Sequence, residues 1–583
     1  MPTALHHPSA WGAEPQGRGL WRFALWAPSA GEVRVEVDGA RTAMERGPDG
    51  VWRVTRPAEA GAPYAFVVDG RATPDPFARA QAGADVTGPS RLVDPRAYAW
   101  GAEWAGRPWE EAVLYELHVG TFTPEGTFAA AAARMADLAS LGITAVELMP
   151  VAHFPGKRGW GYDGALLAAP HPAYGTPDDL RAFVEAAQAA GVMVILDVVL
   201  NHFSPQGSDV PRVVPEMFDP QERTPWGAAI AFGEPMVRAF FRDLCLLWLT
   251  EYRLDGLRLD AVHEIRDPAS ETHVLVELAR AVRAADLGRP LHLVTEDSRN
   301  VPDLREPDAD GGKLYDAEWN DDFHHSLHCL LTDEKHSYLA SFAEDPTRDL
   351  VRALAEGYAE QGQARASGEA RGRPSGHLPW TAFVNHNQNH DQTGNHPGGQ
   401  RLIQIAPEEA LEVAHALLLT GPFVPMLFMG EEAGSRAPFH YFTDVDPALA
   451  LLIQEGRQKE FGGAGHEPFP NPNDMAIFIL SHPFRPADTP RAAEWRDLTR
   501  RLLRFRHERV VPLLKAGRAG APEVSRAGPA AVRAEWPFRA GRLIAQANLG
   551  TPPDGAPVAG APDLAIRAVA RDPFAFAVSV VPA

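Results

Sequence analysis

The chain has 583 residues, of which 45% are hydrophobic and 22% are charged, so its length predicts about two to four globular domains. Acidic residues outnumber basic residues by 76 to 55, which gives a formal net charge of −21. Nucleic-acid-binding surfaces concentrate lysine and arginine, so this balance argues against a nucleic-acid partner and is compatible with a neutral substrate.

Two features of the sequence predict a cytoplasmic protein. The two cysteines, Cys245 and Cys329, are too few for a disulfide-stabilised secreted scaffold. The first residues, MPTALHHPSA, lack the basic start and apolar run of a signal peptide. The most apolar stretch, residues 413–430, contains Gly421-Pro422 and predicts a buried helix, a turn and a strand, so no membrane segment is expected.

Residues 1–108 are predicted to form an N-terminal β-sandwich. Short alternating apolar segments are separated there by Gly, Pro and Asp, as in small two-sheet domains. The segments are WRFALWAP (21–28), EVRVEV (32–37), GVWRVT (50–55) and PYAFVVDG (63–70).

Residues 109–517 alternate strand-like with helix-like segments, and this order predicts an α/β fold with a (β/α)8 barrel. Each strand candidate is nearly continuously apolar and ends in polar residues, as expected for strands buried on both faces. The eight candidates are 113–122, 143–151, 193–202, 256–263, 291–297, 313–319, 380–391 and 424–432. An open doubly wound sheet is the alternative, but eight units and no glycine-rich phosphate loop argue against it.

Helical segments separate the predicted strands and close the barrel. The run 128–142 ends in Gly142, which is expected to act as its C-cap. The last helix of the barrel is expected at 495–514. Beyond it, Pro, Gly and Ala dominate, and short alternating runs predict a small C-terminal β-domain at 518–583.

Acidic residues stand where four of the predicted barrel strands end, which is the position of the active site in this fold. They are Asp197, Asp260, Glu296, Asp297 and Asp391. A glycosidase needs two carboxyl groups flanking the scissile bond, and retaining enzymes hold them about 5–5.5 Å apart, a spacing that neighbouring strands can supply. The sequence therefore predicts a glycosidase built on a barrel.

The fourth strand carries the sharpest pattern. Arg258 and Asp260 are two residues apart, so both side chains point to the same face of the strand. An arginine beside Asp260 favours the ionised carboxylate that a nucleophile requires, although a structural ion pair explains the same spacing equally well. On the fifth strand, the residues alone do not decide between Glu296 and Asp297 as the proton donor.

Further strand-end residues are candidates for sugar binding. Asp391 could support an oxocarbenium-like transition state, and His202 and His390 could hydrogen-bond sugar hydroxyls, although isolated histidines are more often structural. In GWGYDG (159–164), two aromatic rings offer faces for a pyranose, with buried packing as the alternative. The sequence shows no His/Cys cluster with metal-ligand spacing, no phosphate cradle and no G-x-S-x-G elbow, so no metal site and no cofactor are expected.

Four of these strand-end motifs resemble, in order, the signature regions of the α-amylase superfamily of glycoside hydrolases. The motifs are DVVLNH (197–202), GLRLDAVH (256–263), TED (295–297) and NHD (389–391). The resemblance implies a retaining mechanism with Asp260 as nucleophile, Glu296 as acid/base and Asp391 as transition-state stabiliser. It implies substrate-binding roles for Arg258, His202, His390, Tyr162, Trp160, Asp163 and His263.

Longer segments narrow the resemblance to the maltooligosyltrehalose trehalohydrolase family within that superfamily. They are YELHVGTFTPEGTF (115–128), TPWGAAIAF (224–232), TEDSRN (295–300), QNHDQTGN (388–395) and PFHYFTDVDPALALLIQEGRQKEF (438–461). Members hydrolyse the α-1,4 bond next to a terminal trehalose, and their pathway partner is maltooligosyltrehalose synthase. The resemblance therefore implies maltooligosyltrehalose or another α-glucan as substrate, and a carbohydrate-module-like N-terminal domain.

Some residues depart from the pattern of that family. Val445, Gln454 and Gln458 stand where histidine and arginines are common, and HPGG (396–399) also differs. These departures concern product specificity rather than the catalytic acids. Asn201 matches a calcium ligand of many α-amylases, but the insertion after the third strand is short and poor in further acids, so no metal site is predicted.

Two alternatives stand beside a trehalose-releasing hydrolase. A 1,4-α-glucan branching enzyme shares the N-terminal β-domain and the retaining mechanism, but usually has Ser-His-Asp-Glu after the seventh strand, where this chain has Asn389-His390-Asp391-Gln392. A non-catalytic glucan-binding protein is the second alternative. It would have lost a catalytic carboxyl group, and all three are present here.

Overall fold

Eight parallel strands at the centre of the molecule close into a barrel, as the sequence predicts. In order around the barrel they are β10 (Leu114–Leu117), β11 (Ala145–Leu148), β14 (Met193–Val198), β17 (Gly256–Leu259), β18 (His292–Thr295), β19 (Ala317–Trp319), β20 (Phe383–His386) and β21 (Val424–Phe428). Every residue of these strands is buried. This burial on both faces explains why the strands are continuously apolar in the sequence instead of alternating.

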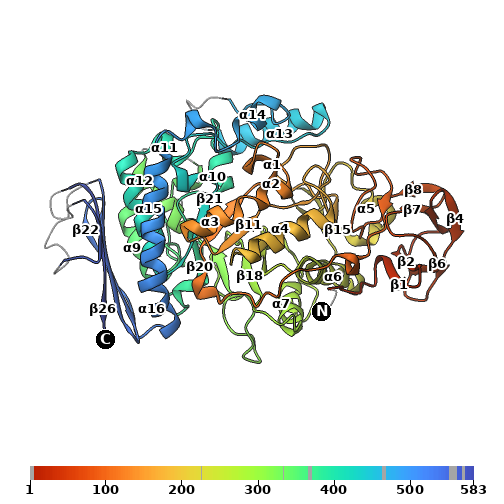
Figure 1. Ribbon diagram of the computed structural model, residues 1–583, viewed down its shortest axis with the longest axis horizontal. Helices are drawn as coiled ribbons and strands as arrows, with labels where there is room; N and C mark the ends of the chain where they lie inside the picture. Colours follow the sequence, from red (N-terminus) through yellow and green to blue (C-terminus); the bar gives the residue numbers. More distant parts are fainter. Residues whose placement is uncertain are drawn as a thin grey trace.

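The computed structural model describes residues 5–224, 226–332, 334–335, 337–365, 370–462, 468–550, 561–567 and 572–583. Over these residues, the helices are too short or too polar to cross a lipid bilayer. The chain runs from an N-terminal pair of sheets through the barrel to a C-terminal sheet. The N-terminal pair and the C-terminal sheet lie at opposite ends of the long axis, with the barrel between them (Figure 1).

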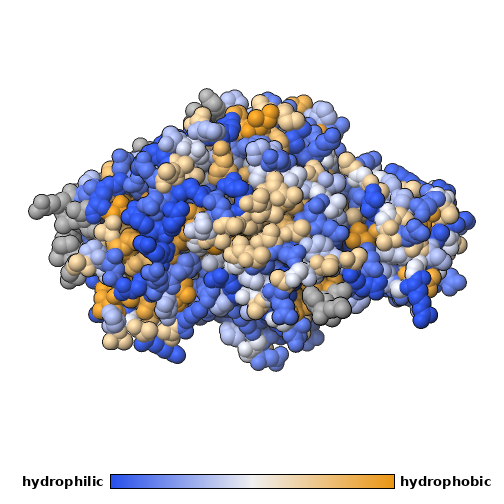
Figure 2. Space-filling model, in the orientation of Figure 1, coloured by the Kyte–Doolittle hydropathy of each residue, from blue (hydrophilic) through white to orange (hydrophobic). Residues whose placement is uncertain are grey.

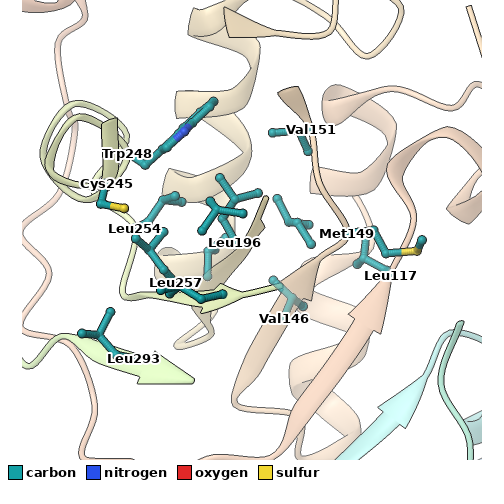
Figure 3. Packing of buried hydrophobic residues seen from close by; sticks show 14 of the residues in the cluster. Leu117, Val146, Met149, Val151, Leu196, Cys245, Trp248, Leu254, Leu257 and Leu293 are labelled. Atoms are coloured by element: carbon teal, nitrogen blue, oxygen red, sulfur yellow. The ribbon is translucent and has the colours of Figure 1, made fainter. Parts of the chain in front are cut away.

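Helices surround the barrel and bury one face against its strands. They include α4 (Pro177–Ala189), α6 (Pro235–Glu251), α7 (Val274–Ala284), α8 (Asp321–Leu331), α12 (Glu408–Thr420) and α15 (Ala492–Phe505). Figure 3 shows Cys245 and Trp248 of α6 in one cluster with Leu196, Leu257 and other strand residues. Truncating one such buried leucine to alanine costs about 2–5 kcal/mol, so this cluster contributes strongly to the stability of the scaffold that carries the strand ends.

Two helices differ in detail from their predicted extents. The run predicted at 128–142 is divided into α2 (Phe128–Ala132) and α3 (Met135–Leu141), because the Arg134 N–H bonds to the Ala131 carbonyl oxygen in a tighter turn. Gly142 ends α3 with a φ of 104°, as the sequence predicts for a C-cap. The helix predicted at 495–514 contains a π-helical turn between α15 and α16 (Val511–Ala516).

The N-terminal region forms two antiparallel sheets, and the four predicted strands are all present. One sheet contains β1 (Gly12–Gly17), β2 (Leu20–Trp26), β6 (Val51–Pro57) and β5 (Glu45–Arg46); the other contains β4 (Ala40–Ala43), β3 (Val33–Val37), β7 (Pro63–Val68), β8 (Arg71–Thr73) and β9 (Ser90–Arg91). Strand β1 was not predicted because GAEPQG shows no apolar alternation. Buried Arg79 joins this region to α6, because its guanidinium pairs with Glu14 at 2.7 Å and Glu251 at 2.8 Å.

The C-terminal region contains a β-sheet, as the sequence predicts, and the sheet is antiparallel with five strands. Its order is β22 (Glu523–Gly528), β23 (Ala531–Phe538), β24 (Gly541–Leu549), β26 (Phe574–Pro582) and β25 (Leu564–Ile566). Trp536 of β23 is buried, and its indole N–H donates to the Leu354 carbonyl oxygen of α9 (Pro346–Glu356) at 3.0 Å. Parts of the predicted domain 518–583, at 551–560 and 568–571, lie outside the described residues. The boundaries 1–108, 109–517 and 518–583 remain our proposal.

Candidate active site

The residues predicted at the strand ends converge on one cleft at the C-terminal mouth of the barrel. The cleft has a volume of about 590 Å³. Nine of the ten predicted site residues line it: Trp160, Tyr162, Asp163, His202, Asp260, His263, Glu296, His390 and Asp391. Arg258, the tenth, is fully buried and contacts three carboxylates at the base of the cleft. Local motifs far apart in sequence therefore meet in one place, as the barrel requires.

Backbone hydrogen bonds fix the two central acids on neighbouring strands. The Asp260 N–H donates to the Val198 carbonyl oxygen at 3.1 Å, and the Glu296 N–H donates to the Leu259 carbonyl oxygen at 3.0 Å. These bonds extend the ladder one residue beyond β17 and β18, so the two carboxyl groups are held side by side. Ala261 then turns the chain with a φ of 41°, a left-handed conformation that is costly for alanine. Its N–H donates to Glu296 Oε2 at 3.1 Å, so this turn also orients the acid.

One arginine holds the base of the site together. Arg258 donates from Nη1 to Asp197 Oδ2 at 2.6 Å and to Asp260 Oδ1 at 3.0 Å, and from Nη2 to Glu296 Oε2 at 2.5 Å. The Trp319 ring supports it from the other side, 3.9 Å from the guanidinium carbon. Three carboxyl groups thus share a single cation. Because like charges this close repel, the cluster favours retaining a proton on one of the acids.

The pKa of Asp260 is raised well above its usual value by burial first and by the neighbouring Glu296 second. Arg258 lowers it, as the sequence predicts, but the effect of burial is larger. Both Asp260 oxygens accept hydrogen bonds, Oδ1 from Arg258 and Oδ2 from Asn201 Nδ2 at 3.3 Å. Glu296 Oε1 has no hydrogen-bond partner among the described residues, and Glu296 lines the cleft.

A second ion-pair network surrounds Asp391. His390 Nδ1 bonds to Glu116 of β10, and His390 Nε2 lies 3.4 Å from Asp391 Oδ1. Burial opposes the charged imidazolium, but Asp391 and Glu116 together raise the pKa of His390 to about 9. Burial also raises the pKa of Asp391 to about 6. A charged His390 therefore fixes Asp391 beside the cleft, where its carboxylate can accept hydrogen bonds from sugar hydroxyls.

The two aromatic residues of GWGYDG differ in how much of each side chain is used in packing. Tyr162 stacks on His390 with ring centroids 5.1 Å apart, and its hydroxyl donates to Asp197 Oδ2 at 2.6 Å. Trp160 is only 4% exposed and stacks on Phe439, so most of its surface is used in packing. Gly161 between them has a φ of 101°, and a Cβ there would meet the Pro150 carbonyl oxygen at 2.0 Å. Glycine is thus required for the turn that presents Tyr162.

Trp226 is a cleft residue that the strand-end argument missed. It is 39% exposed and stacks on His202 with ring centroids 4.5 Å apart and planes within 4°. It lies on the hairpin formed by β15 (Phe218–Thr224) and β16 (Gly227–Ile230), outside the barrel strands. Burial lowers the pKa of His202 to about 4, so its ring is neutral at pH 7. A tryptophan in the mostly polar segment 218–226, outside the predicted strands, was the available sequence signal.

Four other positions bear on the sequence predictions. Asp297, the alternative to Glu296, is buried and pairs with Arg299 at 2.7 Å, and it does not line the cleft. Asp163 is hydrogen-bonded to Tyr441, and burial raises its pKa to about 6. Tyr441 and Arg457 line the same wall and were not predicted. The geometry therefore favours Glu296 as the acid that reaches the substrate.

No group of three or more His, Cys, Asp or Glu side chains is arranged to hold a metal ion in the described part of the chain. Asn201, the position that matches a calcium ligand elsewhere, donates from Nδ2 to the Asp260 carbonyl oxygen at 3.1 Å and to Asp260 Oδ2. The side chain thus helps to fix the candidate nucleophile. Two adjacent carboxyl groups are what double displacement at an anomeric carbon needs, one as nucleophile and one as proton donor.

Comparisons with known proteins point to one family of glycoside hydrolases. The family profile described as α-amylase, catalytic domain, matches residues 74–215. The malto-oligosyltrehalose trehalohydrolase of Deinococcus radiodurans is 40% identical over 474 residues, which cover 80% of this chain and 77% of that protein. The protein of the same name from Arthrobacter ramosus is 41% identical over 480 residues, covering 79% and 82% of the two chains.

A solved structure and a second enzyme class complete the comparison. The crystal structure of a putative α-amylase from Salmonella typhimurium superposes with a TM-score of 0.94 at 43% identity, covering 98% of this chain and 100% of that one. A 1,4-α-glucan branching enzyme from Thiobacillus denitrificans is 34% identical over 349 residues, but these cover only 51% of this chain and 47% of that protein. From its barrel, its acidic cleft and these relatives, the chain belongs to the malto-oligosyltrehalose trehalohydrolase family of α-amylase-type glycoside hydrolases.

Proposed function

We propose that this glycoside hydrolase cleaves the α-1,4 bond adjacent to the terminal trehalose of maltooligosyltrehalose, releasing trehalose and a shortened maltooligosaccharide. The observation that carries the proposal is that Arg258 donates hydrogen bonds to both Asp260 and Glu296, two carboxyl groups that line the cleft. Two relatives named malto-oligosyltrehalose trehalohydrolase, whose alignments cover about four fifths of the chain, support maltooligosyltrehalose as the substrate.

The proposed reaction has two displacements. Asp260 attacks the anomeric carbon while Glu296 gives its proton to the glycosidic oxygen, so the leaving sugar departs neutral and the glucan becomes covalently bound. Glu296, now ionised, takes a proton from water, and the resulting hydroxyl displaces Asp260 with net retention. Arg258 contacts both carboxyl groups, and it therefore stabilises whichever of them carries the negative charge at each step.

Asp391 is proposed to stabilise the positive charge that develops on the sugar ring. The imidazolium of His390 lies 3.4 Å from it and keeps its carboxylate ionised when the cleft is occupied. Tyr162, which stacks on His390, offers the face of its ring to the same sugar. Trp226 and the neutral His202 form a second aromatic wall at the rim. The sugar-binding positions on which selectivity among glucans depends are formed by Asp391, Tyr162, Trp226 and His202.

Two finer statements belong to the same proposal. We infer a cytoplasmic location, which the two free and buried cysteines support because neither is placed to form a disulfide. We also infer that a maltooligosyltrehalose synthase supplies the substrate, since the proposed reaction needs a glucan that already ends in trehalose.

Product analysis tests the proposed function. Maltotriosyltrehalose and maltopentaose have equal length, so a chromatographic comparison isolates the effect of the trehalose end. We expect rapid release of trehalose from the first and slow cleavage of the second. Equal rates for both would contradict the trehalose specificity and leave a general α-glucan hydrolase, whereas new α-1,6 branches would indicate a branching enzyme.

A further inference from the structure

Helix α13 (Pro447–Phe461) lies at the upper edge of the molecule, beside α14 (Met475–Leu480) and above α1 (Val119–Phe122) in Figure 1. One side of the helix lines the cleft through Leu449, Ile453, Arg457, Glu460 and Phe461. Its opposite side is exposed at Leu451 and Leu452, and Figure 2 shows apolar atoms at this edge of the molecule. Ala450 is the single fully buried residue of α13, so core packing holds this helix only weakly.

Arg457 is the one basic residue that α13 places in the cleft. Its Nη2 donates to the Gly394 carbonyl oxygen at 2.7 Å. Its guanidinium carbon lies 4.3 Å from the centre of the Tyr441 ring and 5.1 Å from that of Phe469. Aromatic rings therefore fix the plane of the guanidinium, while the hydrogen bond fixes its rotation.

No carboxylate among the described residues pairs with Arg457. Burial lowers the pKa of Arg457 to about 10, so the group is still charged at pH 7. Arg258 at the base of the cleft pairs with three acids, whereas this arginine has a single bond to a neutral carbonyl group. An enclosed charge without a counter-ion is unfavourable, and it requires hydrogen-bond partners from another source.

Arg457 lines the cleft, and its one hydrogen bond, from Nη2 to Gly394, leaves its other N–H groups without a partner among the described residues. Arg401 offers a comparison, because it is fully buried and both of its terminal nitrogens are sealed in the protein without a hydrogen-bond partner. No nitrogen of the Arg457 side chain is both buried and without a hydrogen-bond partner, so its unused donors are open to a molecule in the cleft. A guanidinium with fixed orientation presents two parallel donors, which match two neighbouring hydroxyl groups of a pyranose.

We propose that Arg457 binds two adjacent hydroxyl groups of the glucosyl unit next to the reacting sugar, on the glucan side of the scissile bond. Gly394 and Asp391 are one turn apart on α10 (His390–Gly394), so Arg457 stands next to the group that contacts the reacting ring. The acid Glu296 defines the opposite side, where the leaving sugar departs. Asp391, Asp163 and Glu460 line the same wall, so an anionic ligand is disfavoured and a neutral glucan fits.

This inference rests on the proposed retaining hydrolysis, and activated donors test it separately from trehalose specificity. α-Glucosyl fluoride fills only the reacting position, whereas α-maltosyl fluoride also fills the position proposed for Arg457. The wild-type enzyme, Arg457→Met and Arg457→Lys are compared by fluoride release. Lys459→Met is the matched control, since Lys459 is exposed on the same helix and outside the cleft.

We expect Arg457→Met to lower kcat/KM for α-maltosyl fluoride by about tenfold or more, mainly through KM, because bonds to a charged donor are lost. The value for α-glucosyl fluoride should stay within about twofold. Arg457→Lys keeps the positive charge but not the two parallel donors of the guanidinium. It should therefore give an intermediate loss of kcat/KM for α-maltosyl fluoride. Lys459→Met should leave both substrates unchanged.

Two results would overturn the inference. Equal losses on both fluorides would show that Arg457 only holds α13 in place, and unchanged values on both would show that it does not bind substrate. Arg457→Lys keeps the test informative if the methionine variant fails to fold. Failure of the proposed function has a different signature, because wild-type enzyme would then release fluoride from both donors but no trehalose from maltotriosyltrehalose.

Discussion

The base and the rim of the cleft are built in different ways. The base consists of strand ends, where Arg258, Asp197 and Asp260 are buried and linked by hydrogen bonds of 2.6–3.0 Å. The rim consists of the β15–β16 hairpin and α13, where Trp226 is 39% exposed and α13 has one fully buried residue. Catalysis needs fixed geometry and water-excluded charges, which a barrel supplies at its strand ends.

The difference between the two regions indicates a division of labour. Substitutions of Asp260 or Glu296 should remove the chemical step, because these two acids line the cleft and are fixed by hydrogen bonds from Arg258. Substitutions at the rim should change KM and product preference while leaving bond cleavage possible. Selectivity among glucans, on this view, depends on elements that are loosely packed and that contact the substrate beyond the reacting ring.

The largest effect is expected from the two central acids. Asp260→Asn removes the nucleophile and should lower kcat by roughly 10⁴-fold or more, with the unfolding midpoint little changed. Steady-state kinetics and thermal unfolding measure the two quantities. An Asp260→Asn enzyme with more than about a tenth of wild-type kcat would exclude this residue as the nucleophile.

A somewhat smaller loss is expected for Glu296→Gln, about 10²–10⁴-fold in kcat for a natural glucan, because proton donation contributes that much. α-Glucosyl fluoride needs no protonation of its leaving group, so the first step should be far less affected with that donor. Asp297→Asn is the matched control, since Asp297 pairs with Arg299 outside the cleft. A greater loss in Asp297→Asn than in Glu296→Gln would reverse the assignment.

At the rim, Trp226→Ala should raise KM for maltotriosyltrehalose by about three- to tenfold and change kcat little. An aromatic contact of this kind contributes about 0.5–1.5 kcal/mol. Trp226→Phe keeps a ring above His202 and should retain most of the affinity. A fall in kcat as large as that of Glu296→Gln would contradict the assignment of catalysis to the base and of substrate binding to the rim.

The ion pair beneath Asp391 predicts a pH dependence of stability. Asp391 and Glu116 raise the pKa of His390 to about 9, above the ordinary histidine value near 6.5. The charged form is thus favoured by the folded state, and the resulting stabilisation is complete below about pH 6.5 and is lost as pH rises through about 9.

Thermal unfolding between pH 6 and pH 10 measures this effect. The wild-type midpoint should fall more steeply over this range than that of His390→Gln, which lacks the titrating group. His377→Gln serves as a control, because His377 is exposed and its partner is Glu306 on the surface. Parallel curves for wild type and His390→Gln would contradict the assigned ion pair.

The smallest effect is expected at Glu147 of β11, whose two carboxyl oxygens are buried without a hydrogen-bond partner among the described residues. Burial raises its pKa well above the usual value and so favours the neutral form, for which glutamine is a near-isosteric replacement. We expect kcat within about twofold of wild type. A raised folded pKa costs stability as pH rises above about 4.3, so Glu147→Gln should gain stability over wild type with increasing pH.

The base of the cleft was predictable from the sequence because its information is local. The i, i+2 spacing alone places Arg258 and Asp260 on one face of the strand end. The choice of Glu296 over Asp297 did not follow from spacing and came from the resemblance to the α-amylase superfamily. The partner of His390 was not predictable in this way, since Glu116 precedes it by 274 residues and only barrel closure brings them together. The same holds for Trp226, whose hairpin folds back over His202 without any periodic signal.

The central claim, that Asp260 forms the covalent bond to the sugar, has a direct test. 5-Fluoro-α-glucosyl fluoride carries a leaving group that needs no acid, and its second fluorine slows release of the bound sugar. After brief incubation with the wild-type enzyme and proteolysis, mass spectrometry identifies the modified peptide. We predict one fluoroglucosyl group on the peptide that contains Asp260. A label on Asp391 or Asp197, or turnover to the inverted product without any label, would contradict the account.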